Sequence, residues 1–374
     1  MRVSDPRGAR HGGRARRRPG ERGIALVLVV WVFMILGVLA LDFSRYIRES
    51  ASASLNFAEE AQGYYLALAG MNRVVYRLAE ARQEGRATAA TTELEENRAG
   101  DLPAWDGTWQ TAHILGGTFE VRVTDEEGLF PINQFADVRR NPGGDELLRR
   151  LISGIVLGPQ SNVQGRDRRT SKEIDAVVDA ILDWVDVDRQ TRANGAEDKY
   201  YLGLNPPYRP KNGYFESPEE LLLVRGVTPE LYYGTNDNPG LRDLISVDSQ
   251  RISINPNTAP PVLLGILLGK DADGLAALEA ARGASPDSFA EELQAQAVQV
   301  GLPPTLFAED AGLTPGLVKV EARADTSRAR NRAHVLWVVD ISDGPGEYHT
   351  RRWVDRAPWT GGLPDTGPPE DVPS

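Results

Sequence analysis

Seven acidic residues gather near the middle of the chain, and they are the residues with the clearest potential for chemistry. Asp175, Asp179 and Asp183 recur at a spacing of four, so they share one helix face, where like charges oppose helix formation. The remaining members of the run are Asp186, Asp188, Glu197 and Asp198. Something should compensate this concentration of negative charge, and a bound cation is one candidate.

From Asp186 onward, oxygen-bearing side chains follow a spacing similar to that of an EF-hand loop. Positions one, three, five, nine and twelve hold Asp186, Asp188, Gln190, Asn194 and Glu197. Ca²⁺ prefers about six to eight oxygen ligands, which carboxylates, amides and backbone carbonyls can supply. The sixth position holds Thr191 where an EF-hand loop needs Gly. We therefore expect an irregular calcium loop.

The expected metal ligands are Asp186, Asp188, Asn194, Glu197 and Asp198. The alternative is a solvated acidic helix end followed by a polar turn that binds no metal. The residues alone leave both interpretations open. If Ca²⁺ binds, its role is structural, because a cation that binds the folded state orders a segment that otherwise repels itself.

Other kinds of chemistry have weak support in this sequence. The absence of cysteine excludes thiolate nucleophiles, disulfides and cysteine zinc sites, and the four histidines are scattered. There is no Gly-x-Ser-x-Gly motif, and the stretch Gly265–Lys270 is one residue too short for a phosphate loop. A hydrolase built from Asp183 and Asp186 is compatible with their spacing but has no accompanying motif. We expect no enzymatic activity.

Two segments resemble helix-hairpin-helix pieces and suggest an alternative function in DNA binding. They are 221–228 and 254–259. Such hairpins bind phosphate through backbone N–H groups and nearby basic side chains. The basic neighbours here are essentially Arg225 and Arg242, in a chain with a net charge of −11. The sequence therefore favours protein-interaction helices, and we expect no nucleic-acid partner.

The elements that position the acidic run begin with an N-terminal apolar segment. Residues Ile24 to Leu41 are consecutive, uncharged and almost wholly apolar. As a helix they span ~27 Å, close to the ~30 Å hydrocarbon core of a bilayer. Eight arginines precede them against Asp5 and Glu21, so by the positive-inside rule the chain after Leu41 is exported.

Three interpretations of this segment compete. It is a cleavable secretory signal, a plain membrane anchor, or a type IV pilin-like leader that is cut between Gly23 and Ile24. The third interpretation retains the apolar segment in the mature protein. Because the leader carries a surplus of six positive charges, its removal changes the net charge from −11 to −17. Such an acidic body suits cations or basic protein partners.

The helical pattern continues beyond the apolar segment, since no proline occurs between Pro19 and Pro103. A mostly apolar stripe recurs at spacings of three and four in Leu55, Ala58, Ala61, Tyr65, Leu68, Asn72 and Val75. Alternating segments at 117–124, 317–323, 334–340 and 348–354 predict strands of one antiparallel sheet that covers this stripe.

The residues between the predicted strand 117–124 and the predicted strand 317–323 are expected to form mainly helices. They are expected at 145–157, 172–187, 217–225, 260–268, 274–282 and 287–298. The fold class is therefore α+β, with a long N-terminal helix on an antiparallel sheet and a large inserted all-α domain. The expected parts are a leader 1–23, a helix 24–82, a sheet from 101–134 and 316–356, an insertion 135–315 and a disordered tail 357–374.

Five motifs resemble those of one protein family. They are Arg22–Leu26, Asp183–Asp186, Asn194–Asp198, Leu204–Tyr208 and Ile254–Ala259. In them the chain resembles the large minor pseudopilin of the type II secretion system, the general secretion protein K (GspK) family. This resemblance implies a type IV pilin-like fold and cleavage by prepilin peptidase between Gly23 and Ile24, although Ile24 replaces the commoner aromatic residue or Met.

The resemblance also implies a place for the protein in the cell. It implies a single-pass inner-membrane protein with its soluble part in the periplasm, at the tip of a pseudopilus, beside GspI- and GspJ-like minor pseudopilins. In that role it contributes to filament assembly, length control and export of folded proteins. Calcium in the inserted domain is likewise implied, which favours the metal interpretation of the acidic run.

Leu28 bears on the position at the tip. It is the fifth residue after the cleavage site, where most pilin-like proteins have Glu that meets the N-terminus of the subunit above. A topmost subunit has no such neighbour, and a buried charge without a partner costs several kcal/mol. Leu28 therefore fits a cap, and the alternative is an ordinary lipid-facing residue. The expected partner surface is the outer half of the helix, Asn56 to Arg77.

Overall fold

The computed structural model describes residues 21–83, 106–114, 117–158, 168–235, 238–308, 315–324, 333–342 and 347–355. The chain divides into two compact units, Met1–Glu59 and Glu60–Ser374, and each is described by itself. Most of the predicted leader and the whole predicted tail lie outside the described residues. The predicted cleavage site and its helix lie within them.

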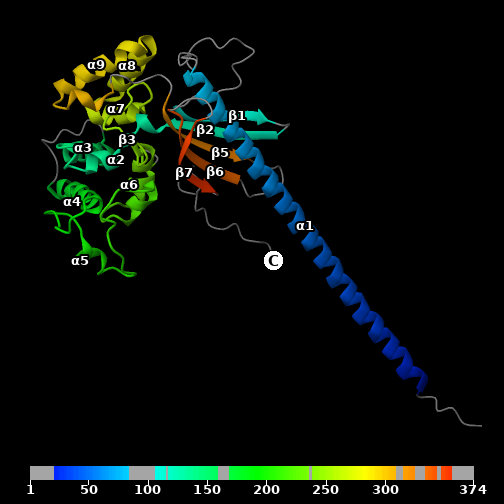
Figure 1. Ribbon diagram of the computed structural model, residues 1–374. Coiled ribbons are helices and arrows are strands. Elements are labelled where there is room, and N and C mark those ends of the chain that lie inside the picture. Colours follow the sequence, from blue (N-terminus) through cyan, green and yellow to red (C-terminus); the bar gives the residue numbers. More distant parts are fainter. Residues whose placement is uncertain are drawn as a thin grey trace, which may run out of the picture. The chain divides into compact units, whose positions relative to one another are not determined.

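The first unit contains the start of α1 (Glu21–Gln83), a continuous helix that begins three residues before its predicted start (Figure 1). Its large apolar side chains from Leu26 to Phe57 are exposed. In the described part of the chain, α1 is the one helix long and apolar enough to cross a membrane. An exposed apolar surface of this length has to be covered in the cell, and a bilayer can cover it.

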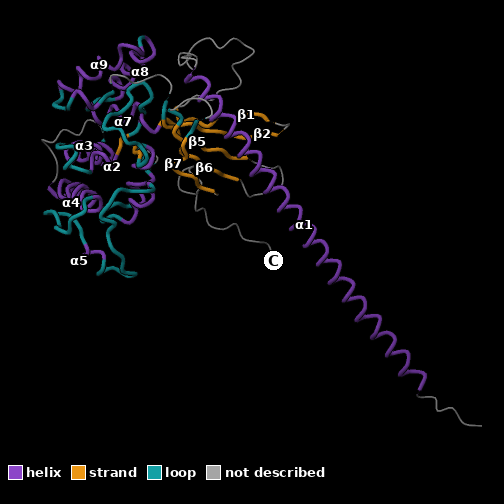
Figure 2. Tube along the Cα trace, in the orientation of Figure 1, coloured by secondary structure: helices purple, strands orange, loops and turns teal. Residues whose placement is uncertain are grey.

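The second unit contains a five-stranded antiparallel sheet with the order β1-β2-β5-β6-β7 (Figure 2). Its strands are β1 (Asp106–Ile114), β2 (Gly117–Asp125), β5 (Leu317–Ala324), β6 (Ala333–Asp340) and β7 (His349–Asp355). Four of the five match predicted strands. β1 was not predicted, because an edge strand of mainly polar residues lacks the alternation that marks a half-buried strand.

The second half of α1 packs on this sheet. The helix contributes Ala67, Met71, Val74, Val75 and Leu78 to a core that the sheet completes with Phe119, Val121, Val123, Val320 and other apolar residues. Each fully buried Val, Leu, Met or Phe side chain contributes about 1.5–3 kcal/mol through removal of apolar surface from water. The predicted α+β architecture is confirmed.

The predicted apolar stripe of α1 was partly wrong. Tyr65 is 66% exposed and Leu55 is 59% exposed, whereas Val75 is 2% exposed and faces the sheet. Asn72 is also exposed. Apolar residues recur at spacings of three and four on two sides of this helix, so the pattern alone did not identify the side that meets the sheet.

The segment between β2 and β5 forms the helical part of the second unit. Its helices are α2 (Ile132–Ala136), α3 (Gly144–Leu157), α4 (Arg168–Val185), α5 (Asp198–Tyr201), α6 (Pro229–Tyr233), α7 (Pro261–Leu268), α8 (Ala272–Ala284) and α9 (Pro286–Gln299). The helix predicted at 217–225 is a 3-10 helix, Pro218–Leu223, and the one predicted at 172–187 ends at Val185. α2, α5 and α6 were not predicted, because four or five residues carry no periodicity.

A short parallel pair, β3 (Phe130–Pro131) and β4 (Ile245–Ser246), lies within this helical part. Phe130 and Ile132, which we expected beside the sheet, belong to the large core of the helical part. That core also contains Trp184, Tyr201 and Phe215. β2 and β5 are neighbours in the sheet, so the chain leaves the sheet at Asp125 and returns to it at Leu317.

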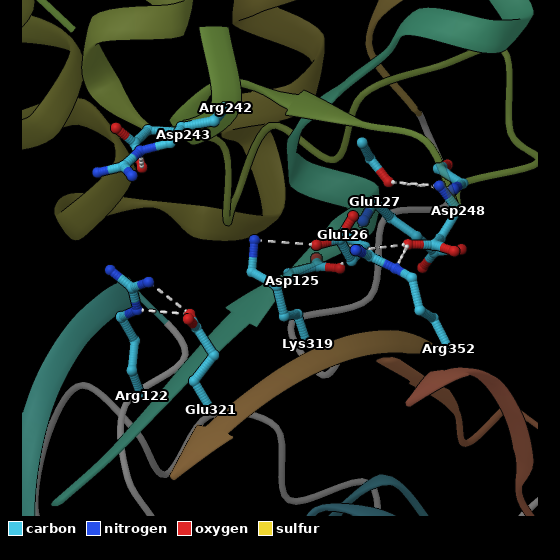
Figure 3. Close-up of polar contacts among 12 residues, drawn as sticks. Arg122, Asp125, Glu126, Glu127, Arg242, Asp243, Asp248, Lys319, Glu321 and Arg352 are labelled. Atoms are coloured by element: carbon cyan, nitrogen blue, oxygen red, sulfur yellow. Dashed lines mark hydrogen bonds and ion pairs between the residues drawn. The ribbon is translucent and has the colours of Figure 1, made fainter. Parts of the chain in front are cut away.

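Charged residues at the end of β2 join the sheet to the helical part (Figure 3). The Asp125 carboxylate accepts hydrogen bonds from Thr258 Oγ1 at 2.6 Å and from Asn255 Nδ2 at 3.0 Å. Beside it, Lys319 pairs with Glu126 at 3.1 Å. The motif 254–259, which resembles a helix-hairpin-helix piece, therefore supplies contacts within the protein at this junction.

Candidate functional site

The predicted acidic site lies where α4 ends and its following loop turns back along the helix. The loop is held by the two inner carboxylates of the helix. Asp179 Oδ2 accepts hydrogen bonds from the backbone N–H and the side-chain amide of Asn194, each at 3.0 Å. Asp183 accepts from the backbone N–H of Arg192 at 3.2 and 3.3 Å. These contacts fold the predicted ligand loop over the α4 carboxylates.

The repulsion expected along α4 is compensated by different partners at each position. Asp175 forms an ion pair with Arg149 on α3. Asp179 binds Asn194, and Asp183 lies 3.6 Å from the Arg192 guanidinium. Gly195 is required at this point, because a Cβ there would lie 2.0 Å from Asp183 Oδ2. The charge of Asp175, the outermost carboxylate, is thus compensated by the Arg149 ion pair without a metal ion.

The carboxylates of Asp183, Asp186 and Glu197 have fewer compensating protein groups. Asp183 is fully buried and Glu197 is 3% exposed. Among the described residues, both oxygens of Glu197 and Oδ1 of Asp186 are buried without a hydrogen-bond partner of normal geometry. A buried carboxylate without a partner is costly, so these oxygens are the ones in this region that a cation would stabilise most.

The pKa values of these three carboxyl groups are raised by burial and by neighbouring negative charge. Burial and the charges of Asp183 and Asp186 together raise the pKa of Glu197 to about 7, while the Asp198 backbone N–H opposes the rise. Burial also raises the pKa of Asp183 to about 6, although the Arg192 backbone N–H lowers it. The pKa of Asp186 is raised by burial and by the charge of Asp188. Burial and mutual repulsion disfavour the ionised form of these groups, and a nearby positive charge would favour it.

The remaining predicted ligands are engaged elsewhere. Asp188 Oδ1 accepts the backbone N–H of Gln190 at 2.8 Å. Asp198 pairs with Arg209 at 2.9 Å and lies 4.0 Å from Arg189. Within the part of the chain that the structure describes, no three Asp, Glu or His side chains are gathered closely enough to hold a metal ion. The donor types fit Ca²⁺, but the carboxylates would have to move together to bind it.

Asp183, which was not among the expected ligands, is buried in the same charge cluster as Glu197 and Asp186. It belongs to the acidic run, where we considered it only as part of the acidic helix face and, with Asp186, as a carboxylate pair. The signal that could have identified it is the spacing of three between Asp183 and Asp186, which brings the last turn of α4 to the start of the loop.

The other predicted site residues lie on α1. Gly23 and Ile24 are in its first turns, and Leu28 is 61% exposed on the same helix. The structure therefore places the predicted scissile bond directly before the apolar segment. Whether this bond is cut stays a prediction.

The two basic residues that we considered for phosphate contacts are engaged within the protein. Arg225 donates to the Gly195 carbonyl at 3.0 Å and lies 4.8 Å from the centre of the Tyr200 ring. Arg242 lies 5.0 Å from the centre of the Tyr233 ring and 3.6 Å from Asp243. These contacts compete with any binding of phosphate.

Comparison with known proteins bears on these features. Residues 128–234, which include the acidic loop, match the family described as "Type II secretion system (T2SS), protein K". Type II secretion system protein K of Pseudomonas aeruginosa is 26% identical over 285 residues, or 74% of this chain and 78% of that protein. Protein K of Aeromonas hydrophila is 25% identical over 263 residues, or 67% of this chain and 71% of that protein.

Over most of its length the chain is similar to the type II secretion protein K family. The fold of the chain also matches that of a solved structure. The crystal structure of the GspK-GspI-GspJ complex from enterotoxigenic Escherichia coli matches with a TM-score of 0.52 at 16% identity, over 82% of this chain and 98% of the matched chain. The resemblance stated from the sequence motifs is thus confirmed.

Proposed function

We propose that this protein is a minor pseudopilin at the tip of a type II secretion pseudopilus. It contributes there to assembly, to length control and to export of folded proteins across the outer membrane. The observation that carries the proposal is one helix, α1, that is apolar and exposed in its first half and packs on an antiparallel sheet in its second half. A pseudopilin needs both halves, one for the membrane and one for its head.

The N-terminal segment supports an inner-membrane anchor with the soluble part in the periplasm. Arginines before the apolar segment keep that end in the cytoplasm. We infer that prepilin peptidase cuts between Gly23 and Ile24 and leaves the apolar helix in the mature protein. Leu28 then replaces the usual carboxylate at the fifth position, as suits a subunit with no neighbour above it.

The side of α1 away from the sheet supplies a surface for other pseudopilins. Its exposed residues Gln62, Tyr65, Asn72 and Tyr76 recur at spacings close to multiples of three and four, so they share one face. Tyrosines of this kind are enriched in protein interfaces. GspI- and GspJ-like minor pseudopilins are the proposed partners, since the solved complex contains a GspK with both.

The acidic loop supports a structural calcium site in the head. Asp186 and Glu197 have oxygens without partners, and buried Asp183 adds a third carboxylate to the same charge cluster. Asp188, Asn194 and Asp198 remain proposed ligands that exchange their present contacts on binding. The ion would supply positive charge that orders the loop, and no catalytic step is proposed for the protein.

The tip position is tested by filament length in cells. Electron microscopy of pseudopili should show longer or more variable filaments when the gene is deleted, and normal lengths when it is restored, because a cap blocks further subunit addition. Unchanged length in the deletion strain would contradict the capping role.

The assembly face is tested by cross-linking, which the absence of native cysteine makes selective. Tyr65→Cys and Tyr76→Cys should form adducts with other pseudopilins in membranes treated with benzophenone-maleimide, which attaches to the introduced thiol and inserts into nearby C–H bonds on irradiation. Val298→Cys, on α9 and 56% exposed, is the control that should not. Equal cross-linking from the control would show that α1 is not the specific surface.

A further inference from the structure

A cavity of about 730 Å³ lies between the edge of the sheet and the helical part, within the second unit. Strand β7 lines it with Arg351 and Arg352. The opposite walls include Arg140, Tyr214, Ser249 and Gln250 from loops of the helical part. This volume falls in the range of about 300–1,000 Å³ that is typical of ligand sites.

The wall formed by β7 has an irregular backbone. Val338 pairs with Arg352 and Val339 pairs with Thr350, so Arg351 is an extra residue that forms a β-bulge. In a regular strand, successive side chains point to opposite faces. A bulge changes the direction of a side chain, which explains how two successive arginines line the same cavity. Bulges of this kind are common at functional sites.

The lining of the cavity favours an anion. Arg140, Arg351 and Arg352 contribute three positive charges, against Asp248 and Glu216, in a chain whose net charge is −11. Two of these arginines are held in place. Arg352 pairs with Asp248 at 2.9 Å, as Figure 3 shows, and Arg351 pairs with Asp340 at 2.8 Å.

Further donors in the cavity are available to a ligand. The side chain of Arg140 is 71% exposed and lies 3.5 Å from Asp137, so this long side chain can also reach a bound group. Ser249 is 2% exposed, and its hydroxyl has no hydrogen-bond partner in the described residues. A buried hydroxyl without a partner is costly, and a ligand that accepts a hydrogen bond from it would remove that cost.

The position of β7 favours a peptide over a small anion. β7 is the last strand of the sheet, and its second edge is paired with no strand in the described part of the chain. An unpaired edge offers backbone N–H and C=O groups that an extended peptide can complete. A small anion would use the arginines but not the strand edge.

We propose that this cavity binds an extended acidic peptide segment of a partner protein. Its backbone lies beside β7, and its carboxylates meet Arg140, Arg351 and the Ser249 hydroxyl. Arginine suits this role because its planar group binds carboxylates through two parallel hydrogen bonds. The site is distinct from the acidic loop and from the exposed face of α1, so its failure would leave the pseudopilin assignment unchanged.

The test uses full-length protein in detergent and a fluorescein-labelled octapeptide of alternating Val and Glu. Fluorescence anisotropy at low ionic strength should show saturable binding of this peptide and none of the matched peptide of alternating Val and Lys. Arg140→Glu should weaken binding by about tenfold, because it reverses a charge at the cavity.

The matched control is Arg139→Glu. Arg139 is the neighbouring residue, is 62% exposed and faces the same Asp137 at 3.8 Å, but it does not line the cavity. The affinity of the Arg139→Glu protein for the Val-Glu peptide should stay within about twofold of that of the unaltered protein. Equal losses in both variants, or no binding of the acidic peptide, would overturn the proposal. Succinate that competes at the same concentration as the peptide would show a small-anion site instead.

Arg351→Glu provides a second variant at the strand itself. It should weaken binding at least as much as Arg140→Glu, because it also removes the arginine that the bulge directs into the cavity. Its melting temperature is measured in parallel, since it breaks the pair with Asp340. A folded Arg351→Glu protein that keeps full affinity would contradict the proposed position of the peptide.

Discussion

Gly70 of α1 lies against the ring of Phe119 on β2, so close that a Cβ at Gly70 would come within 2.2 Å of the ring. Phe119 belongs to the core between the helix and the sheet. The missing side chain lets the helix approach the sheet, and Phe119 fills the space. The relationship explains which side of α1 is buried.

Gly70→Ala should destabilise the second unit, because the added methyl group forces the helix or the Phe119 ring to move. Overpacking of this kind costs about 1–3 kcal/mol, more than the gain in helix propensity of about 0.5–1 kcal/mol. Urea unfolding of the full-length protein in detergent measures it. Gly283→Ala is the control, since a Cβ there meets nothing within 4 Å, and its stability should be equal or slightly higher.

Glu321 should make folding depend on acid pH. Burial by itself raises its pKa, but the His334 hydrogen bond and the Arg122 charge outweigh burial and lower the pKa to about 2. Arg122 Nε donates to it at 2.7 Å. Because the folded pKa lies below the unfolded value of 4.5, the stabilisation is fully present above pH 4.5 and is lost as pH falls toward 2.

Glu321→Gln should therefore lower stability at pH 7 by about 3–5 kcal/mol, since Arg122 loses its buried partner. It should also reduce the decline in stability between pH 4.5 and pH 3. Glu120→Gln, which removes the more exposed partner of Arg323 on the same sheet, should cost about 1 kcal/mol or less. Equal effects of the two variants would contradict this role for Glu321.

Calcium should reverse the effect of a substitution at Glu197. Without Ca²⁺, Glu197→Gln should raise stability slightly, because it removes a buried charge whose oxygens have no partner. With Ca²⁺ the unaltered protein should gain about 2.7 kcal/mol at a hundredfold excess over Kd, and the variant should gain less. Thermal unfolding with Ca²⁺ and with EGTA measures both effects.

Asp186→Ala combined with Asp188→Ala should abolish heat of binding in a calorimetric titration with Ca²⁺. Glu146→Gln, on the exposed side of α3, is the control and should titrate like the unaltered protein. Unchanged calcium binding in the double variant would rule out the assignment of this loop as the metal site.

N-terminal sequencing of the protein from membranes should begin at Ile24. Gly23→Leu should block processing, so the mass should rise by that of the leader and the chain should begin at Met1. An unaltered protein that begins at Met1, or beyond Leu41, would exclude the pilin-like interpretation of the apolar segment.

Much of the architecture was predictable because its patterns are local. The apolar segment at 24–41, the strands at β2, β5, β6 and β7, and the capping pair Ser217 and Glu220 are all marked by neighbouring residues. The motifs also identified the protein family. One-turn helices and the polar edge strand β1 carry too few residues for a pattern, and they were missed.

The sequence by itself determined the apolar segment, the helix, the strands and the acidic run, since hydrophobic periodicity and charge spacing act over short stretches of chain. Tertiary structure alone decided the buried side of α1, the burial of Asp183 and Glu197, and the junction of Asp125 with Thr258. It also decided that Arg140 and Arg351 share a cavity. Such properties depend on contacts between residues far apart in the chain, which local patterns do not record.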